Sequence, residues 1–359
     1  MSDSNAKRLT LPARGGPRKT LLVRTAAGPA IGFGHLRRTL ILARRLRRFV
    51  RPLFLLDSGD RWSLGQVAQH GFASRPFRPR NPRLGAELPA GLLIDTRRMA
   101  GLHALVGEAR RNRIPVASIH DLGLAPLASD VVVDGSMPAA AGGRVGRDAA
   151  FFAGTAYLVL DDSCARFHNA EKRIRSRIRR VVVNLGGGDG GSFFHKILTG
   201  LRSTCRPLEV IGFPGFCTWG QEELTRAQWK PIRFRWLSRD EDAVKLMFEA
   251  DLAVTAGGLA AYEALCLGVP LCALSCDRHQ AITVEALARA GGCIDLGRGA
   301  QLKASDICRR FTELEKDYVL RRRFSAAWHR LVDGGGARRV ARIIRTMIKS
   351  GSRMMSIDD

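Results

Sequence analysis

Short apolar runs alternate along the first half of this chain with stretches of helical period. The apolar runs are rich in Val, Ile and Leu and predict strands, and the amphipathic stretches predict helices. The predicted strands are 20–24, 52–57, 91–95, 116–120 and 130–133, and the predicted helices are 36–49, 63–69 and 103–113. Such alternation is typical of a parallel sheet covered by helices, so we expect an α/β domain over residues 20–160.

A polar and basic stretch at 161–177 breaks this alternation and predicts an interdomain linker. A second alternation follows. Its predicted strands are 180–185, 208–212, 232–236, 252–255 and 270–274, and its predicted helices are 192–202, 241–249, 259–267 and 281–290. We therefore expect a second α/β domain over residues 178–345. Two doubly wound, parallel-sheet (Rossmann-like) domains would face a central cleft, where the carboxyl ends of their strands bind ligands.

The two ends of the chain lie outside these alternations. Residues 1–19 are polar and basic, and we expect them to form a disordered tail. We expect residues 346–359 to form a flexible tail.

The charge balance of the chain suggests what it binds. The 359 residues include 58 Lys and Arg against 33 Asp and Glu, which gives a net charge of +25. This surplus attracts phosphate-bearing partners, which include nucleotides, nucleic acids and anionic membranes. Nucleic acid is the least favoured of these partners because the sequence has no RNA- or DNA-binding motif. The composition does not predict an oligomeric state.

Apolar runs and cysteines together indicate a compartment. No apolar run reaches the roughly 20 residues of a membrane span, and residues 1–19 lack the apolar core of a secretory signal. The eight cysteines form no Cys-x-x-Cys pair and lie mostly in apolar surroundings. We interpret them as reduced thiols and expect a cytoplasmic protein.

The segment Ile31–His35 joins the first predicted strand to the first predicted helix. Gly32 and Gly34 allow a tight turn, and the first N–H groups of the helix point outward, which suits polar and phosphate ligands. His35 can transfer a proton near neutral pH, and the helix dipole disfavours its charged form. We interpret these three residues, and Arg38 in the same turn, as site residues. The alternative is a histidine that caps the helix or packs in the core.

The helix that follows has two distinct faces. Leu36, Leu40, Ala43 and Leu46 share one face, and a basic stripe of Arg37, Arg44 and Arg48 shares another. The basic stripe could contact acidic lipid headgroups, but a solvated face is the simpler interpretation.

A glycine-rich loop at 184–192 opens the second domain. Its backbone can approach a diphosphate or a sugar, so Gly186, Gly187 and Asp189 are candidate ligand contacts. The loop lacks the Gly-Lys-Ser/Thr of a P-loop and the spacing of a dinucleotide fingerprint.

A third strand-to-helix turn contains Gly257 and Gly258, and Glu263 follows one helical turn later. A carboxylate there could accept the hydroxyl groups of a ribose while the helix start faces phosphate, or it could be a surface acid that favours the helix. His279 and Gln280 stand at the next such turn, where an ordinary capped loop is the alternative.

One acidic string, Asp240–Asp242, matches the Asp-x-Asp pattern of metal-dependent glycosyltransferases. It also opens a predicted helix, where acids are favoured by the dipole, and we interpret it as a cap. The sequence predicts neither a metal site nor a cofactor.

Taken in order, these segments resemble the UDP-sugar hydrolases of pseudaminic acid biosynthesis (UDP-2,4-diacetamido-2,4,6-trideoxy-β-L-altropyranose hydrolases), relatives of the GT-B glycosyltransferases. The resemblance covers roughly Leu21 to Arg345. The matching segments are Ile31–Arg38, Phe152–Tyr157, Val183–Asp189, Ala250–Gly258 with Glu263, Cys266–Pro270 and Asp333–Ala337. Each segment is short, but their order and spacing make the set fairly specific.

The resemblance implies a GT-B-like fold whose first domain holds the sugar, whose second domain binds UDP, and whose final helix packs back. It implies that His35 orients or deprotonates the water that attacks the anomeric carbon. It also implies that the loop at Gly186–Gly188 and the helix start at Gly257–Glu263 hold UDP. The expected activity is metal-independent release of UDP from an amino or deoxy sugar, in surface or flagellar glycan synthesis.

Three segments depart from this family. Asp95-Thr96-Arg97-Arg98 stands where Asp-x-Tyr is usual, His120-Asp121 replaces paired aspartates, and His279-Gln280 replaces Asn-Gln. The departures lie on the sugar side more than on the nucleotide side, so they leave the identity of the sugar open. Two other functions also stay open. One is a glycosyltransferase that serves a lipid or protein acceptor at the inner membrane, and the other is a non-catalytic UDP-sugar-binding protein.

Overall fold

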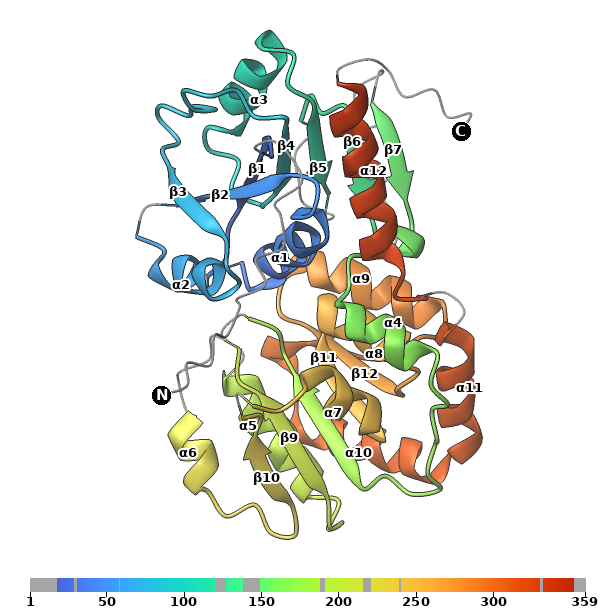
Figure 1. Cartoon of the computed structure of the whole chain (residues 1–359). Helices are drawn as coiled ribbons and strands as arrows, with labels where there is room; N and C mark the ends of the chain where they lie inside the picture. Colours follow the sequence, from blue (N-terminus) through green and yellow to red (C-terminus); the bar gives the residue numbers. More distant parts are fainter. Residues whose placement is uncertain are drawn as a thin grey trace, which may run out of the picture.

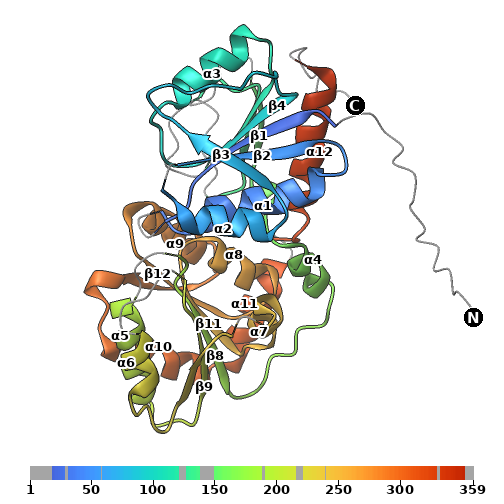
Figure 2. The same cartoon turned by 60° about the vertical axis from the view of Figure 1, so that its left-hand side comes forward.

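The computed structural model describes residues 18–28, 31–57, 59–120, 127–137, 149–187, 191–215, 221–238, 240–329 and 332–351. These residues form two α/β domains, which Figures 1 and 2 show stacked one above the other.

The first domain contains a seven-stranded parallel sheet with the order β3-β2-β1-β4-β5-β6-β7. The strands are β1 (Thr20–Thr25), β2 (Arg51–Asp57), β3 (Ala73–Phe77), β4 (Gly91–Asp95), β5 (Val116–Ile119), β6 (Val131–Asp134) and β7 (Ala150–Ala153). The helices are α1 (Gly34–Leu46), α2 (Arg61–Gln69) and α3 (Leu102–Arg111).

Both faces of this sheet are buried because side chains alternate between two helical layers. Leu21 and Val23 belong to the core that contains α1, whereas Leu22, between them, belongs to the core that contains α3. The apolar face predicted for the first helix is buried, with Leu36 and Leu46 each 1% exposed.

The second domain contains a six-stranded parallel sheet with the order β10-β9-β8-β11-β12-β13. The strands are β8 (Arg180–Asn184), β9 (Glu209–Phe213), β10 (Arg233–Trp236), β11 (Leu252–Ala256), β12 (Leu271–Ser275) and β13 (Ile294–Arg298). The helices are α5 (Gly191–Arg202), α6 (Gln221–Arg226), α7 (Ala243–Glu249), α8 (Leu259–Cys266), α9 (Arg278–Arg289), α10 (Ala304–Lys316) and α11 (Tyr318–His329). Asp242 accepts hydrogen bonds from Val244 and Lys245 at the start of α7, which confirms its interpretation as a cap.

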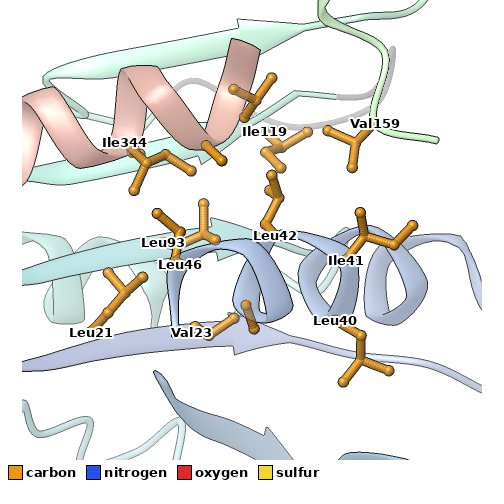
Figure 3. Close-up of a cluster of buried hydrophobic side chains, with 14 of the residues drawn as sticks. Leu21, Val23, Leu40, Ile41, Leu42, Leu46, Leu93, Ile119, Val159 and Ile344 are labelled. Atoms are coloured by element: carbon orange, nitrogen blue, oxygen red, sulfur yellow. The ribbon is translucent and has the colours of Figure 1, made fainter. Parts of the chain in front are cut away.

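The chain crosses between the domains twice. It leaves the first domain through the short 3-10 helix η2 (Thr155–Tyr157) and then α4 (Asp162–His168), which forms inside the segment expected to be a linker. It returns through α12 (Gly336–Ser350), whose apolar face joins the core of the first domain. Figure 3 shows Ile344 of α12 in one cluster with Leu42 and Leu46 of α1.

Two expected boundaries are wrong. The flexible tail expected from 346 begins too early, because α12 continues to Ser350 and Met347 is buried in the core. The disordered tail expected to end at 19 is too long, because the Lys19 carbonyl accepts a hydrogen bond from the backbone N–H of Arg51. Residues 1–17 and 352–359 lie outside the described residues.

In the part of the chain that the structure describes, no helix combines the length and the apolar character needed to span a bilayer.

Candidate functional site

A cavity of about 540 Å³ lies between the two domains and is lined by both. Its position follows from topology: each sheet reverses its strand order beside its first strand, at β1/β4 and at β8/β11, and loops from the carboxyl ends of these strands diverge there. The predicted site residues that line it are Gly32, Gly34, His35, Arg38, Gly186, Gly187, Gly257, Gly258, His279 and Gln280. Asp189 lies outside the described residues.

His35 stands in the first turn of α1 and is bound to a carboxylate from β4. Its Nδ1 lies 2.6 Å from Oδ1 of Asp95, and Asp95 is fully buried at the carboxyl end of its strand. Arg38, one turn further along α1, donates to both oxygens of the same carboxylate at 2.8 Å. The three side chains form one buried cluster, and His35 is not the N-cap of α1, which is Phe33.

The ionisation of Asp95 fixes which nitrogen of His35 carries the proton. Burial alone would raise the pKa of the Asp95 carboxyl, but Arg38 and His35 together lower it below its usual value. An ionised carboxylate only accepts hydrogen bonds, so Nδ1 of His35 is the donor. The lone pair of the imidazole is then on Nε2, and the ring can accept a proton from a ligand in the cavity.

The glycine loops of the two domains touch across the cleft. A Cβ on Gly187 would lie 2.6 Å from the backbone nitrogen of Phe33, and one on Gly32 would lie 3.7 Å from Gly187. Gly186 has φ +76° and Gly32 has φ +70°, which L-residues rarely adopt. Glycine is therefore required at Gly187 by the close approach of the two loops, and it is favoured at Gly32 and Gly186 by their backbone conformation.

The N-terminus of α8 also faces the cavity. Gly258 is its N-cap and makes no side-chain capping bond, and an added Cβ there would meet nothing within 4 Å. Gly257 is packed against the carbonyl of Gln280, only 2.7 Å from where a Cβ would stand. The first N–H groups of α8 thus lie at the wall of the cavity, an arrangement that suits a phosphate or other anion.

Glu263 is buried and is not among the described residues that line the cavity, so the alternative of a surface acid is wrong and its contact with ribose stays a prediction. It lies about one turn inside α8, and its Oε1 is 2.7 Å from Nη2 of Arg37 in α1. Burial raises the pKa of this carboxyl, and the charge of Arg37 opposes that shift. The pair connects the two domains.

The basic stripe of α1 is likewise not a simple solvated face. Arg37 pairs with Glu263, and Arg44 also has an acidic partner. Its Nη2 lies 3.1 Å from Oδ2 of Asp161, the residue before α4. Arg48 remains exposed.

At the start of α9, the capped-loop interpretation of Gln280 is confirmed. Its backbone N–H donates to the N-cap Asp277 at 2.8 Å, and its side-chain oxygen accepts from the Cys276 N–H at 2.9 Å. His279 makes a different contact, because its Nδ1 accepts a hydrogen bond from Arg97 of the first domain.

Sequence reasoning placed three of the residues found here among the sugar-side departures from the family pattern, and it gave none of them an individual role. They are Asp95, Arg97 and His120, which lie at or just beyond the carboxyl ends of the neighbouring strands β4 and β5. Their position at strand ends was the feature of the sequence that could have assigned them a role. His120 is buried and lines the cavity, and its Nε2 has no hydrogen-bond partner among the described residues. Burial lowers the pKa of His120, so its neutral form is favoured.

No family model matches the chain. Over 200 residues it is 28% identical to the spore coat polysaccharide biosynthesis protein SpsG of Bacillus subtilis, a match that covers 55% of this chain and 58% of SpsG. It is also 24% identical, over 263 residues, to the uncharacterized protein MJ1062 of Methanocaldococcus jannaschii. That alignment covers 68% of this chain and 53% of MJ1062. The chain thus spans little more than half the length of the curated relatives it matches.

Solved structures match the chain over most of its length. MurG from Acinetobacter baumannii has a TM-score of 0.63 at 14% identity, and the match covers 92% of this chain and 100% of the MurG chain. A UDP-GlcNAc 2-epimerase from Neisseria meningitidis, solved bound to UDP-GlcNAc, has a TM-score of 0.59 at 13% identity. The match covers 91% of this chain and 100% of the epimerase chain. At such identities the likeness concerns the fold alone. It confirms the GT-B-like architecture of two Rossmann-like domains.

Proposed function

We propose that this protein hydrolyses a UDP-linked amino or deoxy sugar at its anomeric carbon and releases UDP, as a step in the biosynthesis of a surface polysaccharide. The observation that carries the proposal is that His35, which is bound to the buried Asp95, lines the same interdomain cavity as the N-terminus of α8. A proton acceptor and a helix start that suits an anion therefore border one space of substrate size.

The reaction follows from these positions. Nε2 of His35 removes a proton from a water molecule, and the water oxygen bonds to the anomeric carbon as the bond to the β-phosphate oxygen breaks. The electron pair stays with UDP, where the N–H groups and dipole of α8 stabilise the negative charge. Asp95 holds His35 in the required tautomer and stabilises the imidazolium that forms. A single displacement of this kind inverts the configuration of the sugar.

The similarity to SpsG supports the setting in polysaccharide biosynthesis, since that relative is named for spore coat polysaccharide. The likeness to a structure bound to UDP-GlcNAc supports the choice of a UDP-sugar as ligand. The hydrolytic outcome rests on His35 and on the resemblance of the Ile31–Arg38 segment.

The test is release of UDP from a panel of UDP-sugars, with and without added membranes. We expect release without an acceptor, and we expect His35→Asn to abolish it while UDP affinity is retained. His103→Asn is the matched control, because His103 is exposed on α3, away from the cavity. Release that requires membranes would instead indicate a glycosyltransferase, and UDP binding without release from any sugar would indicate a non-catalytic protein.

A further inference from the structure

Arg97 crosses from the first domain to the second. It lies two residues beyond Asp95, yet its guanidinium hydrogen-bonds Nδ1 of His279, and its Nη1 lies 3.5 Å from Oδ2 of Asp277. Both partners stand at the start of α9, and all three side chains line the cavity. A cation of the sugar-side domain is therefore held at a helix start of the opposite domain.

Among the described residues, the other two arginines that line the cavity are bound to buried carboxylates. Arg38 binds Asp95, which is fully buried, and Arg37 binds Glu263, whose side chain is only 7% exposed. Asp277, in contrast, is 40% exposed, and its ion pair with Arg97 is long. Exposed and loosely fitted ion pairs contribute little to stability, so Arg97 can exchange this partner at little cost.

Asp277 also has a second task that does not involve Arg97. Its Oδ1 accepts the backbone N–H of Gln280 at 2.8 Å and so caps α9. Among the described residues that line the cavity it is the only carboxylate. Against it stand three arginines and the N-terminus of α8, so the electrostatic character of this end of the cavity favours an anion with more than one negative charge.

We infer that Arg97 exchanges Asp277 for the β-phosphate of the bound nucleotide and carries part of the charge of UDP as it leaves. This inference rests on the proposed function, and it names the residue that contacts the leaving group in that reaction. A planar guanidinium can bind two phosphate oxygens at once. As the bond from the anomeric carbon to the β-phosphate oxygen breaks, the electron pair passes to an oxygen held by Arg97. Bound diphosphate would then join the two domains through this side chain.

Calorimetric titration with UDP and with UMP tests this contact, because UMP lacks the β-phosphate. Loss of a charge-assisted hydrogen-bonding partner predicts that Arg97→Met weakens UDP binding by about 10- to 100-fold, with UMP affinity nearly unchanged. Arg97→Lys should restore part of the UDP affinity. Arg98→Met is the matched control, since Arg98 is the next residue but pairs with Asp57, outside the cavity lining. It should bind both nucleotides as the wild type does.

A second variant tests the exchange itself. Asp277→Asn keeps a capping side chain at the start of α9 but removes the negative charge that competes for Arg97. We expect it to bind UDP more tightly than the wild type and UMP equally well. Weaker UDP binding in Asp277→Asn, or equal losses for UDP and UMP in Arg97→Met, would overturn the inference.

The outcomes separate this inference from the proposed reaction. If UDP binding depends on Arg97 but the wild type releases UDP from no sugar nucleotide, the reaction fails and the contact stands. If the wild type hydrolyses a UDP-sugar while Arg97→Met binds UDP normally, the contact fails and the reaction stands.

Discussion

Asp95 accepts a hydrogen bond from His35 at 2.6 Å, although the two residues are 60 positions apart in the chain. The contact joins the first turn of α1 to the carboxyl end of β4, which lies next to β1 in the sheet. Because Asp95 is ionised and buried, it orients the imidazole and directs the lone pair of Nε2 away from itself. In the proposed reaction, the reactivity of His35 therefore depends on Asp95, which is not among the described residues that line the cavity.

Replacing Asp95 with Asn tests this dependence. The amide has nearly the same shape as the carboxylate but removes the charge that stabilises imidazolium and the fixed acceptor that selects the tautomer. We expect kcat for UDP release to fall within the range of about 10²- to 10⁴-fold that general acid–base groups contribute. UDP affinity, measured by calorimetry, should not change. An unchanged kcat would show that Asp95 is a structural partner of His35 and no more.

A methyl group at Gly187 should impair the closed arrangement of the domains. Its Cβ would stand 2.6 Å from the backbone nitrogen of Phe33, and a backbone atom cannot be displaced as a flexible side chain can. We expect Gly187→Ala to lower kcat/KM strongly, with little change in the melting temperature, because each domain still folds. The control is Gly65→Ala in α2, where a Cβ meets nothing within 4 Å. Full activity in Gly187→Ala would show that the two loops need not approach this closely.

Removing Arg37 should destabilise the protein more than removing the charge of Glu263. Glu263 is buried, so Arg37→Met leaves a buried charge without its partner, whereas Glu263→Gln leaves a partly exposed arginine. Removal of a partner from a buried pair costs several kcal/mol, and partial exposure of Arg37 reduces this to about 1–3 kcal/mol. Urea unfolding of both variants measures the difference. Equal destabilisation by the two substitutions would argue against a buried carboxylate.

The pH dependence of the Arg37→Met variant gives a second check. Burial raises the pKa of Glu263, so the folded state binds a proton that the unfolded state has already released. Stability from such a group is present at low pH and is lost as pH rises through the folded pKa. Without Arg37 this pKa rises further, so the deficit of Arg37→Met should shrink as pH falls from about 8 to about 5. A deficit that grows on acidification would contradict the assignment.

Lys172 provides a test in the alkaline range. Its Nζ donates to the carbonyls of Phe248 and Ala250, and burial lowers its pKa from 10.5 to about 8. Between these values the unfolded state holds a proton that the folded state has released, so stability rises with pH. Relative to Lys172→Met, the wild type should gain up to about 3 kcal/mol between pH 7 and 10. Parallel stability curves would show that the pKa of Lys172 is not lowered.

The sequence predicted the central strands well and the edges of the sheets poorly. The predicted strand 91–95 matches β4, a central strand whose residues are all buried. The strands β3, β7 and β13 were not predicted, and all three lie at the edge of a sheet. An edge strand has a neighbouring strand on one side only, and the residues of these three strands are mostly half-buried or exposed, so they need not form a continuous apolar run. The segment Ala73–Phe77, for example, contains a serine, an arginine and a proline.

The candidate site was predictable where it depended on local sequence. Glycines before a helix and a histidine in its first turn were enough to single out Gly32, Gly34 and His35. The partners of these residues depend on tertiary structure, and no local pattern places Asp95 beside His35 or Arg97 beside His279. Glu263 was assigned to ribose because its position in a helix start suits that contact. Nothing local showed that Arg37 would cover it.

Hydrolysis in water enriched in oxygen-18 tests the central claim most directly. Attack by a water molecule activated by His35 forms the new bond at the anomeric carbon, so the heavy oxygen should enter the released sugar at its first carbon and not enter UDP. Mass spectrometry of both products measures this, with His35→Asn as the inactive control. Heavy oxygen in the β-phosphate of UDP would mean attack at phosphorus, and it would contradict the placement of His35 as the base for attack at carbon.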